Sequence, residues 1–349
     1  MRNNSKEIDI ALLGSDPGPV DLEQLKKSGK IIRENSGATI LDIGDRVGLI
    51  EFHTKANALN DEVCEMISHA TNSGSLYFDG LVIGNYGRHF SAGANLSLIL
   101  ETAKAENWKA LEQTIRSLQG ANMAVKYGSI PVVAAPFSSA LGGGCEVCLH
   151  ASLVVAAAET HMGLVEAGVG LIPAGGGTKE LGLRAQDKAR QNGTDPYPAL
   201  LEVLQRILMA KVSHNGEEAR QLFLTPADVV VPSATSPILL AKAVVLKLAS
   251  EGPQITSVRN DLTVLGSAGV RTFQMHIKEM FDEKKISEHD SIIAMHLATI
   301  LCGGEQPAGV ASEQHFLDLE REAFLSLLGT AKTQERIAYL LQNNAPLRN

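Results

Sequence analysis

Three mostly apolar runs of strand length, each leading toward a glycine-rich segment, restrict the fold of this sequence more than any other feature. The runs are residues 78–85, 130–137 and 151–159, and the glycine-rich segments after them are 87–96, 138–147 and 162–181. A continuous apolar run of this length is typical of a strand covered on both faces. Glycines let backbone approach a ligand closely and present its N–H groups. One such cluster fits a simple tight turn, but three in succession indicate a ligand site at strand ends.

Strand and helix patterns alternate up to about residue 185, which predicts an α/β fold. Two short strands are expected at residues 38–45 and 47–53, close enough to pair. A helix is expected at residues 61–72, and a long helical region at 95–127. A helix that begins at the glycines of the second segment would point free N–H groups and a partial positive charge at a ligand.

The chain is expected to divide into three parts. Residues 1–37 are polar and interrupted by Gly and Pro, which indicates an N-terminal tail or linker. Residues 38–235 form the predicted α/β domain, and a boundary is expected near residue 235. Residues 236–349 carry amphipathic helical patterns and form the predicted helical C-terminal region. We expect these helices to pack back on their own chain, because they are numerous enough to bury their apolar stripes locally.

Composition indicates a globular protein with a substantial core. Of 349 residues, 44% are hydrophobic and 20% are charged. The net charge of −8 argues against broad binding to nucleic acid or to an anionic membrane surface. No apolar run reaches the ~18 residues that span a bilayer. The first residues contain too short an apolar stretch for a signal peptide.

Cysteine usage predicts a reducing, cytoplasmic compartment. Four cysteines in a chain of 349 residues do not make a disulfide framework. Cys145 and Cys148 form a C-x-x-C pair, but no second pair or histidine stands at zinc-ligand spacing. We expect them to be buried helix residues and expect no metal site. The histidines show no triad or ligand spacing either.

The three glycine-rich segments resemble the signatures of the enoyl-CoA hydratase/isomerase (crotonase) family. Residues 90–96 match the family pattern F-[SA]-A-G-x-[DN]-[LI], and residues 140–146 match A-L-G-G-G-x-E. Residues 163–178 match the segment around the family's second catalytic glutamate. The resemblance covers about residues 38–230. It implies a crotonase (ClpP/crotonase-like) spiral of ββα units, followed here by the helical C-terminal region.

By this resemblance, the backbone N–H groups of Ala94 and Gly143 would form an oxyanion hole around a thioester oxygen. The chemistry fits, because addition of water to a conjugated thioester builds enolate charge on that oxygen. Loss of one preorganised donor in such a site costs about 3–4 kcal/mol of transition-state stabilisation. The side chains of Ala and Gly cannot donate, so the backbone would have to.

The resemblance also assigns acid/base roles to Glu146 and Glu166. Attack of water at C3 releases a proton and C2 gains one, and two carboxyl groups can share this work. Without the resemblance, Glu146 would be an ordinary acid in the first turn of a helix. Glu166 would be an exposed loop acid, although its neighbours are strongly apolar.

Residues 53–60 resemble the family loop that meets the nucleotide of coenzyme A. Lys55 is the basic candidate, with Ala56 and Ala92 as backbone contacts; the alternative for Lys55 is an ordinary surface lysine. The loop is one residue shorter than is usual. Asn95 stands where many family members have Asp. Because Asn carries no charge, a charge-dependent role at this position is in doubt.

The resemblance implies an enoyl-CoA hydratase that adds water syn to 2-trans-enoyl-CoA in fatty acid β-oxidation. The alternatives are a Δ3-Δ2 enoyl-CoA isomerase, which needs one essential acid/base, and a non-catalytic CoA-binding scaffold module. Residues 25–53 and 285–349 resemble parts of fused bacterial proteins that join 3-hydroxyacyl-CoA dehydrogenase to a crotonase module. Implied partners are therefore an acyl-CoA substrate, such a dehydrogenase domain or subunit, a thiolase, and further copies of this chain. No dinucleotide fingerprint is present, so no NAD site or other cofactor is expected.

Overall fold

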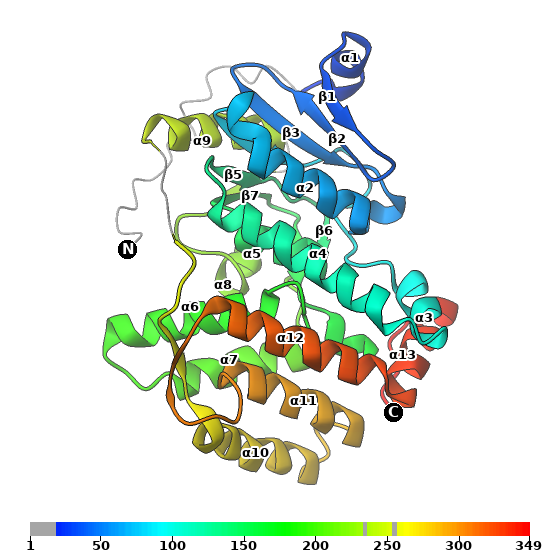
Figure 1. Ribbon diagram of the computed structural model, residues 1–349, viewed down its shortest axis with the longest axis vertical. Helices are drawn as coiled ribbons and strands as arrows, with labels where there is room; N and C mark the ends of the chain where they lie inside the picture. The colour runs from blue at the N-terminus through cyan, green and yellow to red at the C-terminus, as the bar shows by residue number, and fades with distance from the viewer. Residues whose placement is uncertain (1–18, 233–235, 253–256) are drawn as a thin grey trace. The chain divides into compact units, whose positions relative to one another are not determined.

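A computed structural model describes residues 19–232, 236–252 and 257–349 of the chain, which divides into two compact units. Unit 1 consists of Met1–Ala94, Gly120–Gly163 and Val212–Thr256, and unit 2 of Asn95–Gln119, Leu164–Lys211 and Ser257–Asn349. Each unit therefore combines segments that lie far apart in the sequence, as the colours of Figure 1 show. The boundary predicted near residue 235 falls on residues 233–235, which lie outside the described residues.

Within the described residues, the main sheet of unit 1 has seven strands in the order β1-β2-β3-β4-β5-β7-β9. They are β1 (Ile31–Glu34), β2 (Ala38–Asp42), β3 (Val47–Phe52), β4 (Gly80–Ile83), β5 (Val132–Ala134), β7 (Leu153–Ala157) and β9 (Val229–Val231). The first three strands pair antiparallel, and the sheet is parallel from β3 to β9. The predicted α/β fold is confirmed, as is the pairing of the first two expected strands.

Strands of the main sheet alternate with a second, smaller sheet. Strand β5 leads to β6 (Ser139–Leu141) and then to helix α5 (Gly143–His150). Strand β7 leads to β8 (His161–Gly163), which pairs parallel with β6. An isolated parallel bridge between Ser91 and Ala140 adds the first glycine-rich segment to this second layer. The resulting ββα order is the one that the resemblance implies.

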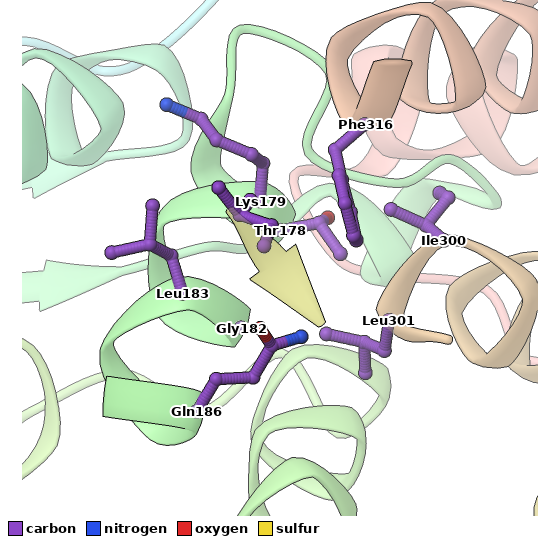
Figure 2. Close-up of a pocket in the computed structure, with 9 residues that line it drawn as sticks. Thr178, Lys179, Gly182, Leu183, Gln186, Ile300, Leu301 and Phe316 are labelled. Carbon is purple, nitrogen blue, oxygen red and sulfur yellow. The ribbon is translucent and has the colours of Figure 1, made fainter. Parts of the chain in front are cut away.

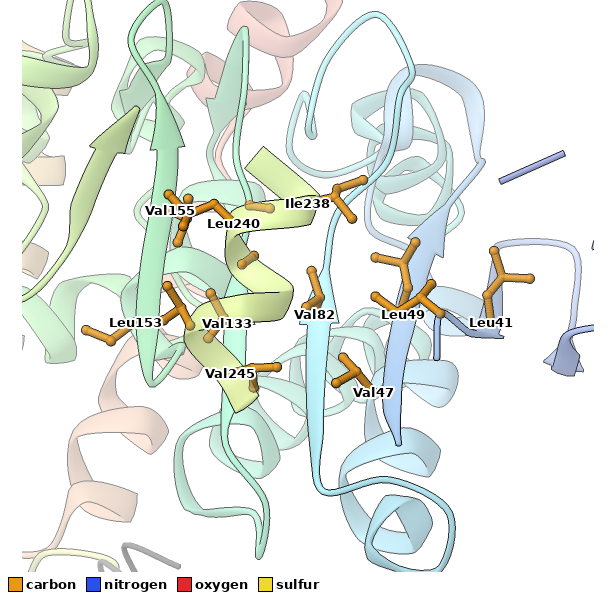
Figure 3. Packing of buried hydrophobic residues seen from close by; sticks show 14 of the residues in the cluster. Leu41, Val47, Leu49, Val82, Val133, Leu153, Val155, Ile238, Leu240 and Val245 are labelled. Carbon is orange, nitrogen blue, oxygen red and sulfur yellow. The ribbon is translucent and has the colours of Figure 1, made fainter. Parts of the chain in front are cut away.

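The core of unit 1 lies between the main sheet and helix α9 (Pro237–Ser250). Leu49, Val82 and Val133, on neighbouring strands, belong to one buried cluster with Leu240 and Val245 of this helix (Figure 3). Intervening strand residues, such as those at positions 50, 81 and 83, are equally buried on the other side. Strands covered on both faces explain the continuous apolar runs in the sequence.

Glycine at position 80 is what lets helix α9 approach the sheet. A Cβ atom there would lie 2.6 Å from Cγ2 of Val245, so any side chain would force the helix outward. Besides α5 and α9, the described helices of unit 1 are α1 (Leu22–Lys27), η2 (Lys55–Asn57), α2 (Asp61–Ser73), η3 (Gly74–Leu76), the second part of α4 (Trp108–Tyr127) and α8 (Gly216–Leu222). Helix α1 and strand β1 fall within the predicted tail, and α9 falls within the predicted helical C-terminal region.

Unit 2 is mainly helical. Its helices are α3 (Leu96–Lys104), the first part of α4 (Trp108–Tyr127), η4 (Glu166–Val169), α6 (Gly177–Asn192), α7 (Tyr197–Leu208), α10 (Gly266–Asp282), α11 (Glu288–Leu301), α12 (Glu313–Leu328) and α13 (Ala331–Asn343). Strands β10 (Leu262–Val264) and β11 (Gly309–Ala311) form an antiparallel pair. Helix α11 packs on α6 and α7, α12 packs on α6, and α13 packs on α3 and η4. The C-terminal helices thus pack on their own chain, as their apolar stripes predict.

Helices α6, α11 and α12 of unit 2 pack closely against one another through apolar residues (Figure 2). Gly182 and Leu183 of α6, Ile300 and Leu301 of α11 and Phe316 of α12 line a recess with no room for a water molecule. A Cβ atom at Gly182 would lie 3.0 Å from a methyl group of Leu301. This recess is therefore a packing interface, not a substrate pocket.

Two predictions from composition can be compared with the structure. The four cysteines are free and buried, and the C-x-x-C pair lies inside α5, as expected. Burial raises the pKa of the Cys148 thiol well above its ordinary value, which leaves it unreactive. Across the described ranges, no helix has both the length and the apolar character needed to cross a bilayer.

We expect Leu49→Ala to destabilise the protein by about 2–5 kcal/mol, because the lost methyl groups leave a cavity in this buried cluster. Leu49 is fully buried, whereas Ile31, in the edge strand β1 of the same sheet, is 37% exposed and serves as the control. Urea unfolding of both variants gives the comparison. Equal losses for Leu49→Ala and Ile31→Ala would contradict this position of the core.

Candidate active site

The first and second glycine-rich segments meet in unit 1. The backbone N–H of Ser91 donates to the carbonyl of Ser139, and that of Leu141 donates to the carbonyl of Ser91, both at 3.0 Å. Gly93 adopts a left-handed φ of +93°. A Cβ atom at Gly93 would lie 3.1 Å from the Leu141 carbonyl oxygen and 3.7 Å from the Gly143 nitrogen. The backbones of the two segments are therefore in contact at these glycines.

This contact brings together the two residues predicted to donate backbone N–H groups. Gly143 is the first residue of α5, where N–H groups have no acceptor within the helix and carry partial positive charge. Ala94 directly follows Gly93. Two N–H groups from separate segments at one place can stabilise a negatively charged oxygen.

Asn95, the next residue, has a structural role. Its side-chain oxygen accepts a hydrogen bond from the backbone N–H of Leu98 at 3.2 Å and caps helix α3. Asn caps a helix about as well as Asp does. The substitution relative to many family members therefore leaves this cap intact.

Close packing at Gly144 holds the start of α5 against the first segment. A Cβ atom at Gly144 would lie 2.6 Å from Cβ of Ser91 and 2.9 Å from its Oγ. Ser91 is fully buried, and its Oγ accepts a hydrogen bond from the Gly93 N–H at 3.2 Å. The Gly142 N–H donates to the Gly163 carbonyl at 2.8 Å, which ties the same turn to the end of β8. The two glycine-rich segments are therefore in direct contact through Gly144 and Ser91.

Glu146 lies in the first turn of α5, three residues after Gly143, and is 2% exposed. Its backbone carbonyl accepts a hydrogen bond from Nδ1 of His150 at 2.7 Å. Because a carbonyl only accepts, Nδ1 carries the hydrogen, and His150 is a buried residue with a hydrogen-bond partner. The structure thus places a buried carboxyl group within one helical turn of a candidate N–H donor.

Glu166 belongs to unit 2, where it begins the short helix η4 and is half-buried. The backbone N–H of Leu171 donates to its carbonyl at 3.0 Å, and Gly170 closes the turn with a left-handed φ of +84°. Helix α13 contacts this turn: Thr333 Oγ1 donates to the Gly170 carbonyl at 2.8 Å. The turn is held by neighbouring structure and is not an open loop.

The predicted nucleotide-binding residues lie beside the first glycine-rich segment. Lys55 and Ala56 are exposed in η2, and the Ala92 N–H donates to the Ala56 carbonyl at 3.1 Å. Asn57 is buried, and its side-chain amide donates to Asn85 Oδ1 at 2.9 Å and to the His89 carbonyl at 2.8 Å. These bonds fix a turn in which both Ala56 and Asn57 have positive φ angles.

Unit 1 therefore contains six of the seven predicted site residues, and unit 2 contains Glu166. The sequence did not single out Ser91, Asn57 or Thr333. Buried polar residues flanked by motif glycines are a signal for Ser91 and Asn57. For Thr333 no local signal exists, because its partner Gly170 lies 163 residues away.

Comparison with known proteins identifies a matching family model and similar relatives. Residues 42–195 match the family model described as enoyl-CoA hydratase/isomerase. A probable 3-hydroxyacyl-CoA dehydrogenase of Bacillus subtilis (strain 168) is 40% identical over 95% of this chain and 41% of its own length. A putative fatty acid oxidation complex trifunctional enzyme of Rickettsia felis is 28% identical over 92% of this chain and 41% of its own length. The chain thus spans about two fifths of both relatives.

Solved structures give the fold. The crystal structure of an enoyl-CoA hydratase from Rhodobacter sphaeroides 2.4.1 matches with a TM-score of 0.61 and 18% identity, covering 90% of this chain and 92% of that one. At this level of identity the match shows a shared fold only. It is the crotonase fold that the motifs imply.

We expect Gly144→Ala to destabilise the protein by about 1–3 kcal/mol, the usual effect of overpacking a tight contact. The clash is with Ser91, so Ser91→Gly in the same chain should recover part of the loss even though it removes the hydrogen bond to Gly93. A double-mutant cycle by urea unfolding measures this coupling. Strictly additive losses would mean that the two residues do not constrain each other.

Proposed function

Because the chain belongs to the enoyl-CoA hydratase/isomerase family, we propose that this crotonase-superfamily enzyme adds water syn to 2-trans-enoyl-CoA thioesters. The observation that carries the proposal is the close approach of the backbone at Gly93, the residue before Ala94, to the turn that begins α5 at Gly143. In the proposed reaction, the thioester oxygen accepts hydrogen bonds from the N–H groups of Ala94 and Gly143. Negative charge then collects on that oxygen when water attacks C3, and the rigid donors stabilise it without reorganising.

Glu146 and Glu166 are the proposed acid/base pair. One carboxylate removes a proton from the attacking water, and the other carboxyl group delivers a proton to C2. Hydration needs both transfers, whereas isomerisation moves one proton between two carbons and needs a single essential group. The presence of both glutamates favours hydration over isomerisation and over a non-catalytic scaffold.

For the nucleotide end of the substrate, we propose contacts from Lys55, Ala56 and Ala92. Lys55 is exposed at the edge of the turn that the Ala92 N–H binds, so its ammonium group is available to a phosphate. Coenzyme A enters as part of the substrate, and no further cofactor belongs to the proposed reaction.

The relatives support a place in fatty acid β-oxidation. One is named a probable 3-hydroxyacyl-CoA dehydrogenase and the other a putative trifunctional enzyme of a fatty acid oxidation complex. We propose that this chain is the hydratase part of such a bifunctional system. Its partners would be a 3-hydroxyacyl-CoA dehydrogenase domain or subunit, a thiolase, or further copies of itself.

The assay is hydration of crotonyl-CoA, followed by loss of the conjugated-enoyl absorbance. We expect turnover by the wild type and a fall in kcat of about 100-fold or more for Glu146→Gln and for Glu166→Gln, with binding of the thioester retained. Glu159→Gln, an exposed residue between β7 and β8, is the matched control and should stay at wild-type rates.

Other outcomes would redirect the proposal. Near wild-type rates in either glutamine variant would remove the role assigned to that glutamate. Conversion of 3-enoyl-CoA to 2-enoyl-CoA without hydration would identify an isomerase. Binding without either reaction would leave the scaffold function.

We also expect no reduction of NAD when the purified chain is supplied with 3-hydroxyacyl-CoA. Hydride transfer needs a dedicated site for the dinucleotide pyrophosphate, and the sequence carries no matching glycine fingerprint. The growth of NADH absorbance is the readout. A sustained increase would contradict the assignment of this chain to the hydratase part alone.

A further inference from the structure

Helix α13 binds the backbone of the turn that carries Glu166. Thr333 Oγ1 donates to the Gly170 carbonyl at 2.8 Å, and Arg336 Nη1 reaches the Ala167 carbonyl at 3.4 Å. Thr333 and Arg336 are both fully buried. Gly170 has no room for a side chain, because a Cβ atom there would lie 2.7 Å from Thr333 Oγ1. The turn and the helix are therefore in direct backbone-to-side-chain contact on both sides of the turn.

The Thr333 hydroxyl is fixed from two directions. Its single hydrogen goes to the Gly170 carbonyl, so Nε2 of His289, 2.8 Å away, must be the donor to its oxygen. Burial, and then the charge of Arg336, lower the pKa of His289. These two hydrogen bonds, one from His289 of α11 and one to Gly170, fix the orientation of the Thr333 hydroxyl group.

Arg336 is anchored in the same way. It pairs with Asp290 Oδ1 at 2.8 Å, donates to Ser287 Oγ at 3.1 Å and donates to Asn349 Oδ1 at 2.8 Å. Asp290 in turn completes a capping box with Ser287 at the start of α11. A buried ion pair with this many hydrogen bonds has little freedom, since breaking it would leave an uncompensated charge in the interior.

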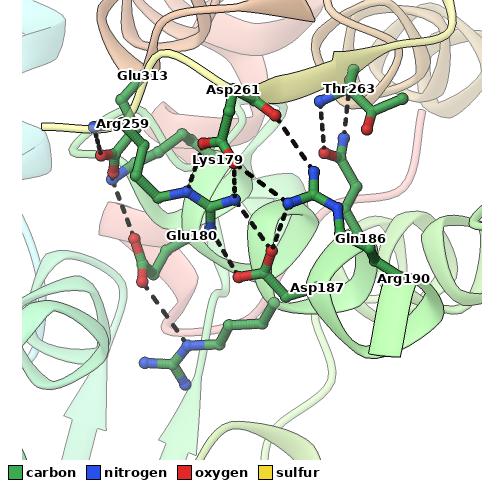
Figure 4. A network of polar contacts seen from close by, with 10 residues as sticks. Lys179, Glu180, Gln186, Asp187, Arg190, Arg259, Asp261, Thr263 and Glu313 are labelled. Atoms are coloured by element: carbon green, nitrogen blue, oxygen red, sulfur yellow. Dashed lines mark hydrogen bonds and ion pairs between the residues drawn. The ribbon is translucent and has the colours of Figure 1, made fainter. Parts of the chain in front are cut away.

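A second set of buried contacts holds the segment that follows the turn. Glu320 of α12 accepts hydrogen bonds from the N–H groups of Gly176 at 2.8 Å and of Lys179 at 2.6 Å, and so caps the start of α6. Lys179 Nζ binds Glu180 at 3.0 Å and Glu313 at 2.8 Å (Figure 4). The glycine-rich segment around Glu166 is thus held by polar side chains of α12 and α13 and not by apolar packing alone.

We propose that Thr333 and Arg336 are positioning residues for Glu166, so that the helical C-terminal region sets the geometry of the acid/base group. The inference rests on the proposed function of Glu166. Acid/base catalysis needs its groups held within about 0.5 Å of the productive position. Displacement by about 1 Å costs on the order of 100-fold in rate. Neither residue touches substrate in this role; they act through the carbonyl groups of Ala167 and Gly170.

The test compares Thr333→Val, which keeps the shape and removes the hydroxyl, with Thr333→Ser, which keeps the hydroxyl. In the crotonyl-CoA assay we expect Thr333→Val to lower kcat by roughly 10- to 100-fold with KM nearly unchanged. Thr333→Ser should restore most of the activity. In a Glu166→Gln background, Thr333→Val should cause no further loss, because the group it positions is already gone.

Thr330→Val is the matched control for a simple effect on folding. Thr330 caps the same helix by accepting from the Thr333 N–H at 3.3 Å, and its hydroxyl donates to Leu327, outside the Glu166 turn. We expect this variant to melt at a lower temperature while its kcat stays within about twofold of wild type. A wild-type kcat for Thr333→Val would overturn the inference. So would losses of activity that follow melting temperature equally at positions 330 and 333.

Hydrogen–deuterium exchange separates this inference from the proposed function. If wild-type protein fails to hydrate crotonyl-CoA, the proposed function fails, and exchange at residues 164–172 still reports on the turn. Faster exchange there in Thr333→Val than in Thr330→Val would support positioning. Unchanged exchange would overturn it, whatever the activity.

Discussion

The contact between the backbones of residues 91–94 and 139–144 is the constraint on which the rest of unit 1 depends. It exists because two glycines lack the Cβ atoms that would crowd the other segment: Gly93 and Gly144. Gly93 and Gly142 also have positive φ angles, which other residues reach only with strain. Strands β4 and β5 end before these segments, so the parallel sheet delivers both to one place. The proposed oxyanion site follows from chain geometry, not from any reactive side chain.

The Glu166 turn in unit 2 is held in place by side chains from other helices. A side chain on a short 3-10 helix has little intrinsic rigidity, since such helices are short and their hydrogen bonds are poor. Here the backbone carbonyls of the turn are bound by side chains from α13, and the segment after it is capped by Glu320 of α12. The helices that hold the Glu166 turn in place therefore lie outside residues 42–195, the range that the family model matches.

The sequence predicted those parts whose signal is local. Buried parallel strands read as apolar runs, and the glycine motifs located Ala94, Gly143 and Glu146 at the end of the second sheet. The three-residue strands β9, β10 and β11 are too short to show a periodicity in the sequence, and β10 and β11 lie within the region predicted to be helical, residues 236–349. Likewise, each unit is built from three separate segments of the chain. This division depends on contacts between distant segments, which no local sequence pattern encodes. The positive φ angles of Ala56 and Asn57 follow from hydrogen bonds of Asn57 to Asn85 and His89, which are also non-local.

The link between Thr333 and Gly170 has a consequence for biosynthesis. Thr333 follows Gly170 by 163 residues, so a ribosome adding about 5–20 residues per second exposes the helix some tens of seconds or less after the turn. During that interval the Gly170 carbonyl must be satisfied by water. The strands that carry the glycine-rich contact of unit 1, from β4 through β8, are complete by Gly163 and precede the turn on the chain. In the nascent protein, the backbone contact that is the proposed oxyanion site can therefore form before Glu166, the second proposed acid/base residue, acquires a fixed position.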